Sequence, residues 1–297
     1  MTTIYGFFRS LPHRLIILTL LVASPLAAQP KTDLPPHGAS VSVNGAVIDY
    51  RDLGGQGRPL LLITGYAVTR EMWDQEFVMN LAARHRVILM DNRGMGEHCA
   101  PPGPMNLQQL AADAAALLDS LGIRKADVLG WSMGGMTAQE LAMSRPELVN
   151  ALVLYATAAD GSTVVPALDR MASMTPEQFR AAMFPGEFAA AMPAVFDRLP
   201  ARPRPPDMSV IARQYTALRD WHCGTKRLAA LRMPVLLLAG GKDWVCPPDE
   251  SRRIAASLPD ARLELMPEGG HWMMHQQPGK LATLVDAFLM TQTRLTD

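Results

Sequence analysis

One serine lies in a segment whose sequence is typical of a reactive turn. Residues 130–135 are Gly-Trp-Ser-Met-Gly-Gly, preceded by an apolar run at 126–129 and followed by a helix-like run at 136–143. A strand, a sharp turn and a helix with Gly-x-Ser-x-Gly at the turn form a nucleophile elbow, which strains the serine backbone and exposes its hydroxyl. We therefore expect Ser132 to be a nucleophile.

An activated serine needs a base, and the base needs a group that orients it. Asp243 follows the apolar run 234–239, and His271 follows the run 261–266. Because the carboxyl ends of parallel strands meet at one edge of a sheet, both side chains are expected beside Ser132. The order Ser, Asp, His along the chain is also the one known for this kind of elbow. These residues form the expected catalytic triad.

Other residues compete for the roles of acid and base. Asp160 follows the strand after the elbow and is the alternative acid. His275 lies four residues after His271 and is expected to be structural, while His222 is expected to be a packing residue at the end of a helix.

The elements that must position these residues alternate along the chain, which predicts a mostly parallel α/β sheet with helices on both faces. A hairpin is expected at 39–52 around Asn44-Gly45, the preferred two-residue turn. Further strands are expected at 59–64, 86–90, 126–129, 149–156, 234–239 and 261–266. Helices are expected at 72–83, 107–121, 136–143, 248–257 and 278–291.

The alternation stops between residues 158 and 232, where no buried strand is expected. Thr175 and Pro176 predict the start of one helix, and a second is expected at about 207–221. A helical insertion between two sheet strands predicts a lid, and its several methionines suit an adaptable apolar surface or the seam beneath it. The expected organisation is thus a core of 39–157 and 233–297 with a lid of 158–232.

The N-terminal residues have the composition of an export signal. Basic residues up to Arg14 precede an apolar run at 15–23 and the small residues Ala27-Ala28. The run is shorter than the roughly 20 apolar residues that span a bilayer. We predict a signal peptide at 1–28, a leader at 29–38 and a periplasmic or secreted protein, with an uncleaved anchor as the alternative.

The charge and the cysteines limit the partners. The net charge is +0 without a long basic run, so no nucleic acid is expected to bind. Cysteine occurs three times, at Cys99, Cys223 and Cys246, without metal-ligand spacing, so no metal site is expected. If the protein is exported to an oxidising compartment, Cys223 and Cys246 could form a disulfide between the lid and the loop that carries Asp243, or remain two buried thiols. Cys99 is free in either case.

Together these motifs resemble the α/β-hydrolase family over about residues 40–291, and most closely its serine esterase- and lipase-like branch, which includes aclacinomycin methylesterase-like and enol-lactonase-like enzymes. Residues 91–96, Asp-Asn-Arg-Gly-Met-Gly, match a loop of that branch. Asp243 with Pro247, and His271 with Pro278, match its acid and base blocks.

The chain departs from that branch at three positions. Thr64 stands where a histidine is usual, His98 replaces a small residue, and Gln276 stands where an acid is common. The resemblance implies an oxyanion hole formed by the backbone N–H groups of Tyr66 and Met133. Because Thr64 replaces that histidine, we expect the loop that carries Tyr66 to be supported differently from that of the branch.

A serine nucleophile argues against dehalogenase and epoxide-hydrolase chemistry, which require a carboxylate. The expected function is hydrolysis of a small carboxylic ester or lactone with an apolar part, through an acyl-enzyme and without a cofactor. The alternatives are haloperoxidase-like perhydrolysis or C–C bond hydrolysis on the same triad. A non-enzymatic alternative is a periplasmic ligand-binding protein.

Overall fold

The computed structural model of the 297-residue chain describes residues 38–200 and 207–293. The predicted signal peptide, and the predicted leader up to residue 37, lie outside the described residues. Among the described helices, none combines the length and apolar character needed to cross a bilayer.

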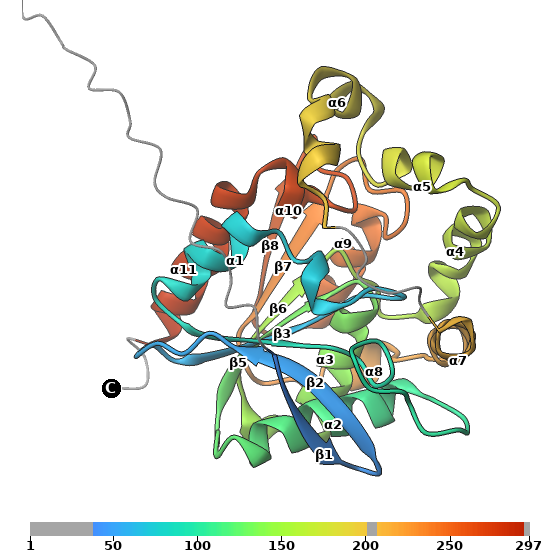
Figure 1. Ribbon diagram of the computed structural model, residues 1–297. Coiled ribbons are helices and arrows are strands. Elements are labelled where there is room, and N and C mark those ends of the chain that lie inside the picture. The colour runs from blue at the N-terminus through green and yellow to red at the C-terminus, as the bar shows by residue number, and fades with distance from the viewer. Residues whose placement is uncertain (1–37, 201–206, 294–297) are drawn as a thin grey trace, which may run out of the picture. The chain divides into compact units, whose positions relative to one another are not determined.

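An eight-stranded sheet runs through the molecule in the order β1-β2-β4-β3-β5-β6-β7-β8 (Figure 1). The strands β1 and β2 form an antiparallel hairpin, β2 is antiparallel to β4, and the remaining neighbours are parallel. The bounds are β1 Ala39–Val43, β2 Ala46–Asp52, β3 Pro59–Ile63, β4 Arg86–Met90, β5 Ala126–Trp131, β6 Val149–Tyr155, β7 Val235–Gly240 and β8 Ala261–Met266. The predicted mostly parallel sheet is confirmed.

Local signals in the sequence account for the ends of these elements. Asn44 and Gly45 join β1 to β2 with φ values of 48° and 72°, as a two-residue turn of this kind requires. Asn106 caps helix α2 (Leu107–Ser120), since its side-chain oxygen accepts a 2.7 Å hydrogen bond from the Gln109 N–H. The turn confirms the predicted hairpin, and the cap explains why the helix predicted at 107–121 begins where it does.

Helices cover both faces of the sheet (Figure 1). Helix α1 (Gln75–Ala82) packs on α11 (Pro278–Thr293), while α2 packs on α3 (Met133–Ser144) on the other face. Helix α9 (Pro248–Ser257) packs on β7 and β8. The central strands are therefore shielded from water on both sides, which explains their largely apolar sequences.

The inserted segment, residues 158–232, contains helices but no strand in its described part. These helices are α4 Val165–Ala172, α5 Pro176–Ala182, α6 Gly186–Ala191, α7 Met208–Arg219 and α8 Thr225–Leu228. The helix predicted at Thr175 is α5, which begins with a reciprocal Thr175–Gln178 capping box, and the helix predicted at 207–221 is α7. The sequence did not predict α4, α6 and α8, because elements of 8, 6 and 4 residues are too short to show a helical period.

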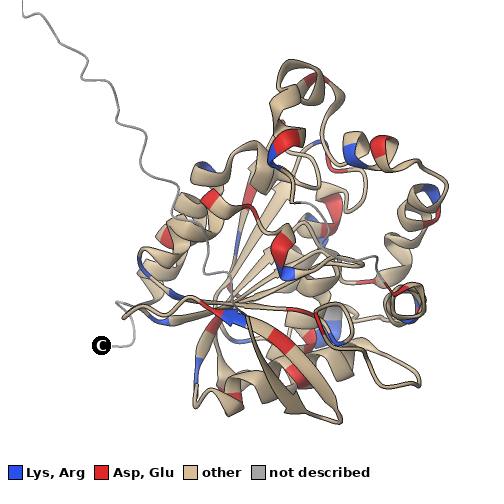
Figure 2. Cartoon of the chain, in the orientation of Figure 1, with Lys and Arg blue, Asp and Glu red and all other residues tan. Residues whose placement is uncertain are grey.

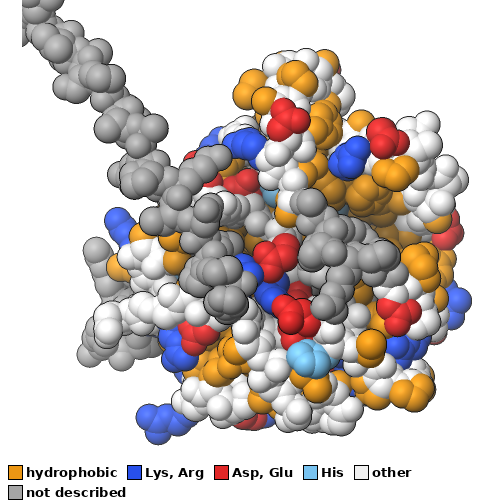
Figure 3. Space-filling view, in the orientation of Figure 1, with side chains coloured by type: hydrophobic (Ala, Val, Ile, Leu, Met, Phe, Trp, Pro, Cys, Tyr) orange, Lys and Arg blue, Asp and Glu red, His pale blue; other side chains and the backbone are white. Residues whose placement is uncertain are grey.

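Side chains on the surface differ between the core and the inserted segment. Figure 2 shows Lys and Arg interspersed with Asp and Glu, without a face of single charge in that view. Figure 3 shows apolar side chains gathered on the inserted segment around α5 and α6. The most exposed large apolar side chain of the described residues is Met208, at 67%.

Candidate active site

Ser132 occupies a strained turn between β5 and α3. Its φ of 56° and ψ of −121° place a non-glycine residue in a region that L-amino acids rarely adopt. A Cβ atom on Gly130 would overlap the backbone of Gly134, and one on Gly134 would overlap the backbone of Ile63. Both glycines are therefore required sterically, and the turn has the geometry of the predicted elbow.

Asp243 and His271 form a buried pair. The Nδ1 atom of His271 lies 2.8 Å from Oδ2 of Asp243, and the residues are 5% and 3% exposed. Oδ1 of Asp243 accepts hydrogen bonds of 2.8 and 3.0 Å from the N–H groups of Val245 and Cys246. With both oxygens engaged, the carboxylate orients the imidazole through Nδ1 and leaves Nε2 as the ring nitrogen that it does not bind.

Ser132 and the Asp243–His271 pair have neighbouring residues in common. The Trp131 ring lies 5.9 Å from the His271 ring, centroid to centroid. The Ser132 hydroxyl lies beside the thiol of Cys246, whose pKa is raised mainly by burial and also by the nearby Asp243 charge. Within the described residues no hydrogen bond joins Ser132 to His271; rotation about one side-chain bond would redirect the hydroxyl, and such bonds are often loose before substrate binds.

The segment that carries His271 is fastened at several points. Tyr155 lies at the end of β6, and burial raises the pKa of its hydroxyl so that it stays protonated and donates a 3.1 Å hydrogen bond to the His271 backbone oxygen. Gln276, the departure from the family pattern, accepts a 2.7 Å hydrogen bond from Gly270 N–H and donates one of 3.0 Å to Glu268 O. The amide thus closes the loop before His271.

The loop after β3 carries the predicted first oxyanion donor. A Cβ atom on Gly65 would lie 3.3 Å from the Cβ of Ser132, so this loop packs directly on Ser132. Within the described chain, the backbone N–H groups of Tyr66 and Met133 donate no hydrogen bond to another residue, which leaves both for a ligand. The Nδ2 group of Asn92 donates to O and Oγ1 of Thr64 at 3.2 and 3.3 Å, so the loop after β4 holds the residue that stands in place of the usual histidine.

The competing residues have other partners. Asp160 accepts hydrogen bonds from the N–H and hydroxyl groups of Ser162 and lies 2.9 Å from Nδ1 of His222. His275 lies 3.2 Å from Asp74 and 3.2 Å from Met72 O. Every histidine in the described residues is paired with an aspartate, so pairing alone does not identify the base. The pairs are His85–Asp286, His98–Asp49, His222–Asp160, His271–Asp243 and His275–Asp74.

The hypothesis of a Cys223–Cys246 disulfide is wrong, because all three cysteines are free. Sγ of Cys223 lies 3.7 Å from Sδ of Met143, near the end of α3, whereas Cys246 contacts Ser132 at the start of that helix. At 1.5 Å per residue the two ends of α3 are about 16 Å apart. This far exceeds the roughly 7 Å between Cα atoms that a disulfide tolerates.

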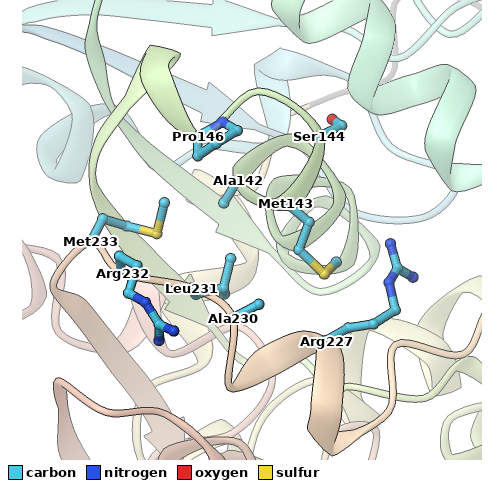
Figure 4. Close-up of a pocket in the computed structure, with 9 residues that line it drawn as sticks. All are labelled: Ala142, Met143, Ser144, Pro146, Arg227, Ala230, Leu231, Arg232 and Met233. Carbon is cyan, nitrogen blue, oxygen red and sulfur yellow. The ribbon is translucent and has the colours of Figure 1, made fainter.

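A groove of about 420 Å³ lies at the far end of α3. Figure 4 shows the residues that line it. Because α3 starts directly after Ser132, this groove is separated from Ser132 by the length of the helix. Arg227 on its wall is ion-paired with Glu140 at 2.7 Å. The lining residues are Ala142, Met143, Ser144, Pro146, Arg227, Ala230, Leu231, Arg232 and Met233.

The described residues hold no cluster of His, Cys, Asp or Glu that could bind a metal.

The sequence model of the alpha/beta hydrolase family matches residues 60–284. The chain is 32% identical to a putative carbamate hydrolase, RutD, of Azorhizobium caulinodans over 75% of this chain and 87% of the relative. It is 30% identical to a putative non-heme bromoperoxidase, BpoC, of Mycobacterium tuberculosis over 80% and 95%. The solved structure of an esterase from Rhodococcus sp. ECU1013 is 27% identical, with a TM-score of 0.69 over 86% of this chain and 98% of that one. On the sequence match and the parallel sheet together, this chain belongs to the alpha/beta hydrolase family.

Proposed function

We propose that the protein hydrolyses a carboxylic ester or lactone through an acyl-enzyme formed on Ser132. The observation that carries this proposal is the 2.8 Å pair of Asp243 and His271 at the sheet edge that presents the strained Ser132. In this mechanism the Ser132 oxygen attacks the carbonyl carbon and its proton passes to Nε2 of His271. The same proton then leaves with the alcohol, and Asp243 stabilises the imidazolium between the two steps.

The charge that develops on the carbonyl oxygen requires hydrogen-bond donors. We assign this role to the backbone N–H groups of Tyr66 and Met133, which have no partner among the described residues. Met133 is also the first residue of α3, whose N-terminus favours negative charge. Water completes the reaction by attacking the acyl group, with His271 as its base.

The relatives support carbonyl chemistry and keep one alternative open. The neighbour named as an esterase and the relative named as a carbamate hydrolase favour hydrolysis. The relative named as a bromoperoxidase favours perhydrolysis, in which hydrogen peroxide replaces water as the attacker of the same acyl-enzyme. Both reactions would use Ser132, so the acceptor of the acyl group distinguishes them.

The inserted segment is proposed to act as a cap over this site, because it contacts the loops of both the acid and the base. Trp244 Nε1 donates a 2.6 Å hydrogen bond to the Ala182 oxygen, and Trp272 N–H donates one of 3.2 Å to the Met183 oxygen.

Export through residues 1–28 is a separate proposal. N-terminal sequencing of the protein from a periplasmic fraction tests it, and an intact Met1 there would contradict cleavage.

A fluorophosphonate probe and an ester panel test the activity. We expect the probe to label the wild-type protein but not Ser132→Ala, and p-nitrophenyl esters of graded acyl length to be hydrolysed. The substitution should lower kcat on the order of 10⁶-fold, as in other serine hydrolases. Peracid formed from an ester and hydrogen peroxide would favour the second candidate. A wild-type protein without labelling or turnover would instead favour a ligand-binding protein.

A further inference from the structure

The loop that carries Tyr66 is held in a strained conformation. Ala67, directly after Tyr66, has a φ of 56°, which is rare for a residue with a side chain. Such a conformation persists only where neighbouring groups hold it. One group that holds Ala67 comes from the inserted segment.

Gln214 on α7 makes this contact. Its Oε1 atom accepts a 2.9 Å hydrogen bond from the Ala67 N–H, although the two residues are 147 positions apart. The side chain is 0% exposed, and its Nε2 group is buried without a hydrogen-bond partner among the described residues. The opposite orientation of the amide would place two donors against each other, so the contact with Ala67 determines which end of the amide stays unpaired.

The unpaired Nε2 group shows that Gln214 is a poor choice for stability alone. A buried donor without a partner is unfavourable, and an apolar side chain of similar size would avoid it. What an apolar side chain could not supply is the oxygen that holds the Ala67 N–H.

We propose that Gln214 is a positioning residue for the oxyanion hole. By holding the peptide that follows Tyr66, it keeps the Tyr66 N–H directed toward the carbonyl oxygen of the substrate. Helix α7 of the inserted segment therefore completes the site instead of only covering it. The inference rests on the proposed roles of Ser132 and Tyr66.

Arg213, the preceding residue on α7, offers a matched control. Its guanidinium donates hydrogen bonds of 2.7 and 3.2 Å to the backbone oxygens of Pro101 and Gly103, so it fastens the same helix to a different loop. Arg213→Met loosens the docking of α7 without removing the Ala67 contact. Gln214→Met removes that contact while nearly preserving the volume of the side chain.

The test measures kcat and KM for the best p-nitrophenyl ester, together with the affinity of a trifluoromethyl ketone, which forms an oxyanion when Ser132 adds to it. Loss of a direct oxyanion donor costs about 10²–10³ in kcat, so we expect Gln214→Met to lower kcat by roughly tenfold to a hundredfold. Its KM should stay within about threefold, while the ketone affinity should fall in parallel with kcat/KM. Gln214→Glu keeps an acceptor at this position and should retain most of kcat.

Different results would overturn different claims. Wild-type kcat and ketone affinity in Gln214→Met would overturn the inference, and so would an equal loss in Arg213→Met, which would assign the effect to helix docking. If Gln214→Met does not fold, Gln214→Asn makes the same test with an amide too short to reach Ala67. A wild-type protein with neither turnover nor labelling of Ser132 would overturn the proposed function and this inference with it.

Discussion

The hydroxyl of Tyr155 is hydrogen-bonded to the backbone oxygen of His271 at 3.1 Å and also accepts a 3.1 Å hydrogen bond from Met274 N–H. Tyr155 ends β6, which lies beside the elbow strand β5 in the sheet. A single buried side chain on a rigid strand thus holds both ends of the short segment that bears the proposed base. The position of His271 relative to Ser132 therefore depends on the sheet as well as on its own loop.

Tyr155→Phe should separate the positioning of His271 by the Tyr155 hydroxyl from the packing of the Tyr155 ring. The ring can keep its stacking on Trp131, 6.2 Å away between centroids, but His271 O and Met274 N–H lose their partner. Leaving buried groups unpaired should lower the free energy of unfolding by about 1–3 kcal/mol. Displacement of the base should lower kcat by about one to two orders of magnitude. Tyr50→Phe on β2 is the control, and a Tyr155→Phe variant with wild-type kcat would contradict the argument.

Asparagine substitutions at Asp243 and Asp160 should rank the two candidate acids. Asp243→Asn replaces the acceptor that holds His271 Nδ1, and the equivalent change in the serine-protease template lowers kcat by about 10⁴. Asp160→Asn should change kcat little, because Asp160 caps a turn and asparagine is an equally good capping residue. Steady-state kinetics of both variants decide the question, and the reverse ranking would move the acid to Asp160.

Features encoded over a few neighbouring residues could be predicted from the sequence. The Asn44-Gly45 turn, the Asn106 cap and the glycines around Ser132 each depend on local backbone geometry that few residue types satisfy. The positions of Asp243 and His271 after two parallel strands were predictable for a related reason. Parallel strands align their carboxyl ends, so residues that follow them share one edge.

Contacts between distant parts of the chain could not be predicted in the same way. Tyr155 and His271 are separated by 116 positions and Ala67 and Gln214 by 147, and nothing in either local sequence indicates the partner. The only signal for Tyr155 was a tyrosine at the end of a buried strand, whose hydroxyl must find a partner. The hypothesis of a Cys223–Cys246 disulfide was wrong for the same reason, since the distance between the two cysteines depends on the length and direction of α3.

Asp91 should make the stability of the protein depend on pH in the opposite sense to an ordinary paired carboxylate. It is 1% exposed, and burial raises its pKa from 3.8 to about 6 although Arg70 beside it opposes the shift. Because the folded-state pKa is above the unfolded one, the contribution of Asp91 to stability is fully present below about pH 4 and is lost as the pH rises through about 6.

Denaturant unfolding of wild type and Asp91→Asn across that range measures this contribution. The free energy of unfolding of wild type, minus that of the variant, should fall by up to about 3 kcal/mol between pH 4 and pH 7, at 1.36 kcal/mol per pKa unit. Subtracting the free energy of unfolding of the variant cancels the effects of the other carboxylates. One of these is Asp74, whose pKa is lowered and whose contribution to stability is instead lost in acid. A difference that rises with pH would show that the Arg70 ion pair outweighs burial.

The three cysteines should differ in reactivity in the native protein and become equivalent on unfolding. Cys99 is exposed, whereas Cys223 and Cys246 are buried. Burial raises the pKa of Cys223 to about 11 and that of Cys246 well above its ordinary value, so neither forms the reactive thiolate readily. A disulfide-forming aromatic reagent at pH 8 should therefore modify one thiol of the native protein rapidly. In denaturant without reductant it should modify all three. Cys99→Ser is the control and should remove the rapid native reaction alone. A single reactive thiol in the denatured, unreduced protein would restore the disulfide that the structure contradicts.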